Sequence, residues 1–113
     1  MERTANIKSL SEAERGGLIQ FFEVTFELSW KTMKAYLEAQ GFIVKTPREA
    51  IKQAFQIELI GDGQIWLQAL GDRNLTTHTY DEETSLKIEQ MIKEKYFPVI
   101  KDFYEKLKTE ARS

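Results

Sequence analysis

The sequence predicts an all-α protein, an antiparallel up-and-down helical bundle of about four helices. Its hydrophobic residues recur at steps of three and four, and only two prolines and six glycines punctuate 113 residues. The loops between the apolar stripes are short, as in bundles whose neighbouring helices run antiparallel. A chain of this length fits one core, so we expect a single domain over residues 1–113.

The first helix is expected from about Gly17 to Gln40, with Gly41 as its C-terminal cap. Its large apolar residues follow the period of a buried helical face. They are Ile19, Phe22, Phe26, Trp30, Met33 and Leu37. On the polar face, Glu27 and Lys31 form a favourable i,i+4 pair, and Glu23 extends that face.

The second helix has the clearest local start signal. Thr46 and Glu49 are spaced as a capping box, and Pro47 stands where its missing N–H has no cost. Loss of such a cap would cost about 1 kcal/mol. This helix is expected to carry Ile51, Phe55 and Ile57 and to end before Gly61.

A third helix is expected to begin at Asp62 as N-cap and to carry an apolar group. The group consists of Ile65, Trp66, Leu67 and Leu70. Gly71 weakens the helix by roughly 1 kcal/mol relative to alanine. The helix either bends there or continues straight into the segment 73–80.

The last helix is expected from about Glu82 to Lys108, with Asp81 as N-cap and acidic residues in its first turn. Its buried stripe consists of Ile88, Ile92, Tyr96, Ile100, Phe103 and Leu107. Pro98 lies inside the pattern, so we expect a kink or break near Lys95 to Phe97.

Composition excludes several classes of protein. Hydrophobic residues make up 42% and charged residues 30%, and no apolar run is long enough to cross a bilayer. The first six residues have no signal-peptide core. With no cysteine and one histidine, a disulfide framework, thiolate chemistry and a dedicated zinc site are not expected. We therefore expect a cytoplasmic protein with no membrane contact, no metal and no cofactor.

The net charge of −2 limits contact with nucleic acid, because proteins that grip long nucleic acids usually present a basic surface. Any such contact should be local, or shared with a partner or a second copy of the chain.

The candidate site is a polar segment that contains Arg73, His78 and Tyr80. Poor helix formers and polar residues fill the gaps and flank it. They are Asp72, Asn74, Thr76, Thr77 and Thr79. A single histidine is more often structural than catalytic, but a helix needed only for packing would not carry such a run.

Arg73 and His78 would lie roughly 140° apart on a regular helix. They can meet on one ligand only if the helix deforms or if two copies of the chain face each other. A histidine can act as general acid or base, and an arginine can hold a phosphate or stabilise a phosphorane-like transition state. The pair therefore suits metal-independent cleavage of RNA through the adjacent 2′-hydroxyl.

At these residues the sequence resembles the HEPN superfamily, whose pattern is Arg, four residues, His, any residue and Tyr. It is most similar to the nucleotidyltransferase substrate-binding branch. Three runs carry this resemblance, which covers roughly Ser11 to Leu107. They are Gln20 to Lys31 (QFFEVTFELSWK), Thr46 to Ile51 (TPREAI), and Trp66 through Glu83.

The resemblance implies a helical bundle that forms a homodimer, with the Arg-His motifs of both chains near one cleft. It also implies a partner, a separately encoded minimal nucleotidyltransferase. In toxin–antitoxin members the HEPN chain is an RNase, with Arg73 and His78 as the catalytic residues here. The nucleotidyltransferase restrains it by transferring AMP onto the motif tyrosine, which corresponds to Tyr80.

Three readings of function stay open at this point. The chain is an RNase toxin, a non-catalytic subunit that binds nucleotide or substrate for the nucleotidyltransferase, or a purely structural bundle. We expect Asp72, Asn74, Thr77, Glu23 and Glu27 to line the site, although Glu23 and Glu27 also fit a solvated helix face.

Two further expectations concern the tryptophans and the start of the chain. Trp30 and Trp66 are expected in the core rather than as stacking residues for a ligand. Family members usually open with a longer first helix, so we expect this chain to be shortened at its N-terminus.

Overall fold

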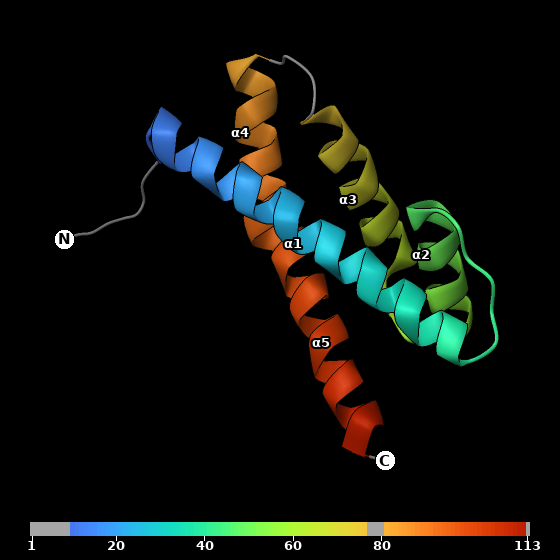
Figure 1. The fold of residues 1–113 in the computed structure, drawn as a ribbon. Coiled ribbons are helices and arrows are strands. Elements are labelled where there is room, and N and C mark those ends of the chain that lie inside the picture. Colours follow the sequence, from blue (N-terminus) through green and yellow to red (C-terminus); the bar gives the residue numbers. More distant parts are fainter. Residues whose placement is uncertain (1–9, 77–80, 113) are drawn as a thin grey trace.

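The computed structural model describes residues 10–76 and 81–112, with side chains to residue 110. It confirms the all-α fold, and no strand occurs in these residues. The elements are α1 (Glu12–Ala39), α2 (Pro47–Gln56), α3 (Gly63–Leu75), α4 (Glu82–Met91), a π-helical turn (Ile92–Tyr96) and α5 (Phe97–Arg112). Figure 1 shows α1 crossing the long α4–α5 helix, with α2 and α3 packed together beside them.

Helix α1 begins five residues earlier than predicted. Ser11 is its N-cap: the Ser11 hydroxyl accepts a hydrogen bond from the Glu14 N–H (3.1 Å), and the Glu14 carboxylate accepts one from the Ser11 N–H (2.9 Å). This capping box satisfies two N–H groups that the helix itself leaves unpaired. At the other end, Gly41 follows the helix with φ of +96°, a conformation that favours glycine.

Helix α2 begins as predicted, with one difference in its cap. The Thr46 hydroxyl accepts a hydrogen bond from the Glu49 N–H (3.1 Å), but the Glu49 carboxylate accepts from the Lys45 N–H (2.8 Å) and not from Thr46. Ile51 is buried, whereas Phe55 is 53% exposed. Ile57 is the first residue after the helix, so the expected apolar stripe of α2 is only partly a core face.

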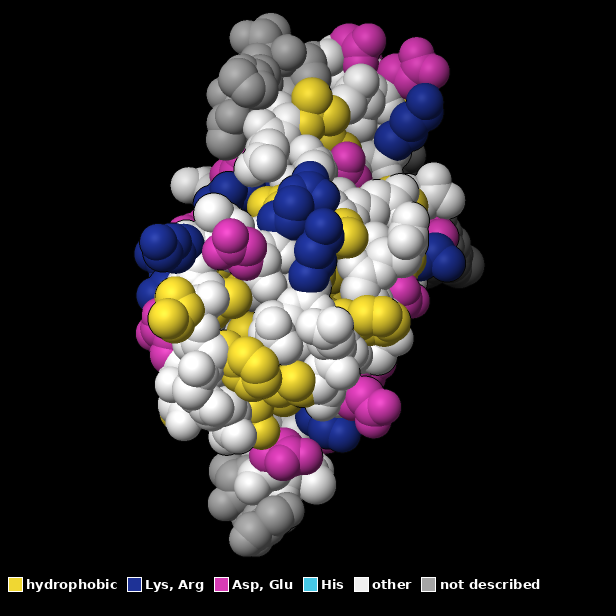
Figure 2. Space-filling model, turned by 90° about the vertical axis from the view of Figure 1, so that its right-hand side faces the viewer, with side chains coloured by type: hydrophobic (Ala, Val, Ile, Leu, Met, Phe, Trp, Pro, Cys, Tyr) yellow, Lys and Arg dark blue, Asp and Glu magenta, His cyan; other side chains and the backbone are white. Residues whose placement is uncertain are grey.

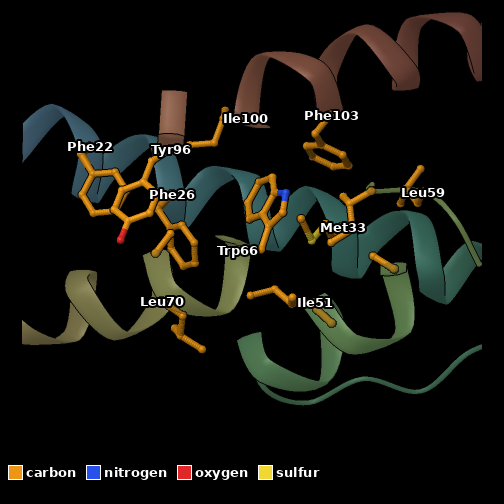
Figure 3. Packing of buried hydrophobic residues seen from close by; sticks show 14 of the residues in the cluster. Phe22, Phe26, Met33, Ile51, Leu59, Trp66, Leu70, Tyr96, Ile100 and Phe103 are labelled. Atoms are coloured by element: carbon orange, nitrogen blue, oxygen red, sulfur yellow. The ribbon is translucent and has the colours of Figure 1, made fainter. Parts of the chain in front are cut away.

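The core consists of residues from every helix, and aromatic rings join its layers. Phe22 stacks on Tyr96 with ring centroids 5.3 Å apart, and Trp66 lies between Phe26 (5.9 Å) and Phe103 (5.7 Å), as Figure 3 shows. Burial of each such side chain contributes about 1.5–3 kcal/mol.

The two tryptophans differ in burial. Trp66 is buried, which confirms its expected place in the core. Trp30 is half-buried and packs against the core, with its Nε1 lacking a hydrogen-bond partner in the described part of the chain.

The irregularity predicted near Pro98 is a π-helical turn rather than a break. Pro98 has no N–H, and its ring would clash with the carbonyl of residue 94 in a regular α-helix. The wider turn over Ile92–Tyr96 relieves this conflict, and the Phe97 N–H donates to the Ile92 carbonyl. Helices α4 and α5 therefore form one continuous long helix (Figure 1).

A buried ion pair joins the start of α1 to α4. Arg15 Nε donates to Glu89 Oε1 at 2.8 Å, and Lys93 Nζ lies 2.9 Å from the other carboxylate oxygen. Burial raises the pKa of Glu89, but hydrogen bonds from Lys93 and Arg15 outweigh it and hold this pKa below its ordinary value.

No helix in the described part of the chain is long and apolar enough to span a membrane.

Candidate functional site

Helix α3 ends at Leu75, inside the segment that the sequence places on a helix. Asp62 caps its start as predicted, and Gly71 lies within it without a break. Thr76 is the C-cap, and its hydroxyl lies 2.7 Å from the Arg73 carbonyl, a local bond that competes with the helical pattern. Of the predicted segment 73–80, α3 carries Arg73 to Leu75, and residues 77–80 lie outside the described residues.

Three predicted site residues, Thr77, His78 and Tyr80, lie outside the described residues. The angle of about 140° expected between Arg73 and His78 on a straight helix is therefore not tested. The roles of these three residues stay predictions.

Arg73 reaches from the last turn of α3 to the middle of α1. Its Nη2 donates a hydrogen bond to Glu27 Oε1 and forms an ion pair with that carboxylate. Its Nη1 donates to Asn74 Oδ1 at 3.0 Å. Lys31 lies 3.5 Å from the other oxygen of Glu27, so this carboxylate stands between two cations. The guanidinium is half-buried and held in one orientation.

Glu23, one turn before Glu27 on α1, meets the end of α3 in the same way. Its carboxylate lies within hydrogen-bonding distance of the Thr76 hydroxyl. That hydroxyl has one hydrogen, so it donates either to Glu23 or to the Arg73 carbonyl. The structure thus brings both predicted glutamates to the end of α3, which a purely solvated helix face would not require.

A groove of about 480 Å³ opens at this contact between α1 and α3. Its lining combines the charged residues with apolar side chains that α1 exposes. The lining residues are Glu23, Val24, Glu27, Leu28 and Arg73. Among these described residues Arg73 is the only cation, and Glu27 already pairs with it, so an anionic ligand in the groove would compete with Glu27 for the guanidinium.

Asp72 lies beside Arg73 in the chain but faces α4–α5. The hydroxyl of Tyr96, in the π-helical turn, donates a hydrogen bond to the Asp72 carboxylate. Burial and this carboxylate together raise the pKa of Tyr96 well above its usual range. Sequence reasoning placed Tyr96 only in the apolar stripe. The phenolic hydroxyl, its one polar group, was the only sign that it would have a hydrogen-bond partner in the core.

The described residues contain no group of three or more His, Cys, Asp and Glu side chains that could hold a metal ion. Arg73 instead places guanidinium N–H donors at one end of α3. Such an arrangement suits a phosphate or another oxyanion.

Comparison with known proteins identifies the family. Residues 1–109 match the family described as nucleotidyltransferase substrate binding protein like. The chain belongs to this family. The match agrees with the resemblance found in the sequence, and it covers α1 through most of α5.

Two further proteins are similar to this chain. The chain is 35% identical over 82 residues to a probable ribonuclease HepT of Haemophilus influenzae, an alignment that covers 64% of this chain and 53% of the relative. It thus spans about half the length of that protein. The crystal structure of a protein from Thermus thermophilus has the same fold, with a TM-score of 0.77, 32% identity, and coverage of 95% of this chain and 88% of the other.

Proposed function

We propose that this protein is the HEPN-type partner of a separately encoded minimal nucleotidyltransferase and cleaves RNA. The observation that carries this proposal is Arg73, fixed by Glu27 at an open groove in a chain 35% identical to a probable ribonuclease. Arg73 places guanidinium donors where a phosphodiester can enter, and His78 follows five residues after Arg73.

In this mechanism the 2′-hydroxyl of a nucleotide attacks the adjacent phosphorus. A base takes the hydroxyl proton, the P–O5′ bond breaks, and the departing 5′-oxygen receives a proton, which leaves a cyclic 2′,3′-phosphate. His78 supplies the acid–base function, and Arg73 stabilises the charge that develops on the phosphoryl oxygens. For this, Arg73 must exchange Glu27 for the phosphate.

A second copy of the chain completes the site in this proposal. Phe21, Val24 and Leu28 leave large apolar side chains exposed on α1, and two of them line the Arg73 groove. Exposed apolar stripes beside a polar site favour protein association. A homodimer packed through this face would place two Arg73 grooves next to each other. Leu28→Asp should then shift the sedimentation of the chain from dimer to monomer, and Leu86→Asp on α4 is the matched control.

The proposal is tested by incubating the purified chain with RNA in the presence of a chelator. Wild-type protein and Lys101→Gln, a change on the exposed face of α5, should cleave it. Arg73→Ala and His78→Ala should each lower the rate at least about a hundredfold. Unchanged cleavage by His78→Ala would rule the mechanism out.

Control by the nucleotidyltransferase is the second part of the proposal. The Tyr80 oxygen attacks the α-phosphorus of ATP, pyrophosphate leaves, and the hydroxyl proton passes to solvent. Mass spectrometry after incubation with the partner and ATP should show one AMP added to Tyr80 and none in Tyr80→Phe. The same preparation should have lost RNA cleavage.

The family description favours one alternative, a non-catalytic subunit that binds substrate for the nucleotidyltransferase. This reading predicts binding of nucleotide or partner without RNA turnover. Arg73→Ala would then weaken binding, whereas wild-type protein would leave RNA intact.

A further inference from the structure

The outer face of α2 carries two cations and an exposed aromatic ring. Arg48 and Lys52 are one turn apart, and Phe55 follows three residues later, so the three share one side of the helix. All three are exposed, and Phe55 is 53% exposed. The inner face of the same helix packs Ile51 and Ala54 into the core. The exposed face is therefore not needed to hold α2 in place.

The ring of Phe55 is fixed from one side. It lies against Gly63, the first residue of α3, where an added Cβ would come within 3.0 Å of Phe55 Cγ. An alanine at this position would therefore require the ring to shift by a few tenths of an ångström. One side of the ring is thus held by the backbone of α3, while half of the side chain stays open to solvent.

A hollow of about 300 Å³ adjoins this ring. It lies between α2 and the start of α3. Its lining residues are Ile51, Lys52, Phe55, Gly61, Asp62, Gly63, Gln64 and Leu67. This volume is at the lower end of the range for small-molecule sites, about 300–1,000 Å³. It suits a flat group of the size of one base rather than a larger ligand.

The two cations of this face can bind an anionic ligand without first breaking an ion pair. Within residues 10–76 and 81–110, neither Arg48 nor Lys52 is in an ion pair, whereas Arg73 pairs with Glu27 and Lys34 with Glu38. Of the nearby acids, Asp62 already caps α3, and Glu58 lines a neighbouring hollow together with Lys52 and Phe55 without pairing with Lys52. Figure 2, which views the molecule from the side where α2 lies, shows Lys and Arg beside hydrophobic side chains.

We propose that this face of α2 is a second contact site for single-stranded RNA, an inference that rests on the proposed function. An unpaired base stacks on Phe55, and the flanking phosphates bind Lys52 and Arg48. Aromatic rings interleaved with cations bind single strands in this way with little sequence preference. Gly63 and Arg73 are ten residues apart on α3, about 15 Å of helix, so one strand can contact both sites.

Fluorescence anisotropy tests the proposal with a labelled 2′-O-methyl oligonucleotide, which lacks the free 2′-hydroxyl that cleavage needs. Phe55→Leu keeps an apolar side chain on Gly63 but removes the stacking ring, and it should weaken binding about five- to tenfold. Lys52→Gln should lower the slope of log affinity against log salt by about 0.7. Lys101→Gln, with the same change of charge on α5, should change neither. A urea midpoint close to that of wild-type protein confirms that each variant is folded.

Unchanged affinity in Phe55→Leu, or wild-type protein that does not bind the oligonucleotide, would overturn the proposal. Unchanged RNA affinity with weaker capture of the nucleotidyltransferase would assign this face to a protein partner and overturn it as well. Cleavage of a ribodinucleotide, too short to reach both sites, should be unaffected by Phe55→Leu and lost in His78→Ala. Cleavage that persists in His78→Ala refutes the proposed function alone.

Discussion

The ion pair between Arg15 and Glu89 allows a direct test of how burial determines the strength of a salt bridge. Arg15 and Glu89 are 2.8 Å apart, with side chains only 6% and 10% exposed. Lys34 and Glu38 lie at the same distance, but their side chains are 34% and 47% exposed. The distance between the charged atoms is thus the same in the two pairs, while the solvent exposure of their side chains differs.

Arg15→Met keeps the apolar stem of the side chain and leaves Glu89 without its buried partner. Such a loss usually costs about 3–5 kcal/mol. Lys93 still binds Glu89, with a side chain 46% exposed, so the expected cost is nearer to about 2–3 kcal/mol. For 113 residues this corresponds to a fall in Tm of about 8–12 °C. Lys34→Met should cost only about 0.3–0.5 kcal/mol.

Urea denaturation followed by tryptophan fluorescence measures both variants. Because the pKa of Glu89 is lower in the folded protein than the unfolded value of 4.5, the ionised carboxylate stabilises the fold fully above that pH. This stabilisation is lost as the pH falls through the pKa that Glu89 has in the folded protein. The difference between wild-type protein and Arg15→Met should therefore shrink below about pH 4.5. Equal losses in Arg15→Met and Lys34→Met would refute the reasoning.

Three further predictions concern single contacts. Tyr96→Phe removes the hydrogen bond to Asp72 and should lower the free energy of unfolding by about 1.5–2 kcal/mol, measured by urea denaturation. Because the pKa of Tyr96 is raised in the folded protein, this hydrogen bond contributes fully below about pH 10 and should contribute less above it. A difference between wild-type protein and Tyr96→Phe that stays constant at high pH would count against the bond. Glu27→Gln frees Arg73 and should tighten binding of the 2′-O-methyl oligonucleotide about threefold, with weaker binding as the contrary result. Gly63→Ala should lower the free energy of unfolding by about 1 kcal/mol, because the ring of Phe55 must move to make room for the added Cβ. An unchanged urea midpoint would show that the ring does not have to move.

The helix starts at Thr46, Asp62 and Asp81 were predictable because a cap depends on residues only three positions apart. The start of α1 was missed although Ser11 and Glu14 form a capping box. Its first buried residue is Arg15, a charged side chain, so the apolar period begins a turn later than the helix.

Contacts between helices could be predicted only in part. The four-residue spacing of Glu23 and Glu27 placed both on one face of α1. The helical periodicity of α1 does not show, however, that the end of α3 packs against that face. Phe55 fits an apolar stripe, but it packs against Gly63 of another helix and stays 53% exposed. The partner of Tyr96 depends likewise on how α3 meets the π-helical turn.

The π-helical turn also reconciles the spacing of a buried row in the long helix. Ile88, Ile92, Tyr96 and Ile100 are each four residues apart, and all four are buried. On a regular α-helix each step of four advances about 40° beyond a full turn, so the last side chain would lie about 120° from the first. A wider turn absorbs this drift and returns Ile100 to the core. The turn therefore accommodates both the proline ring and the four-residue repeat of the buried row.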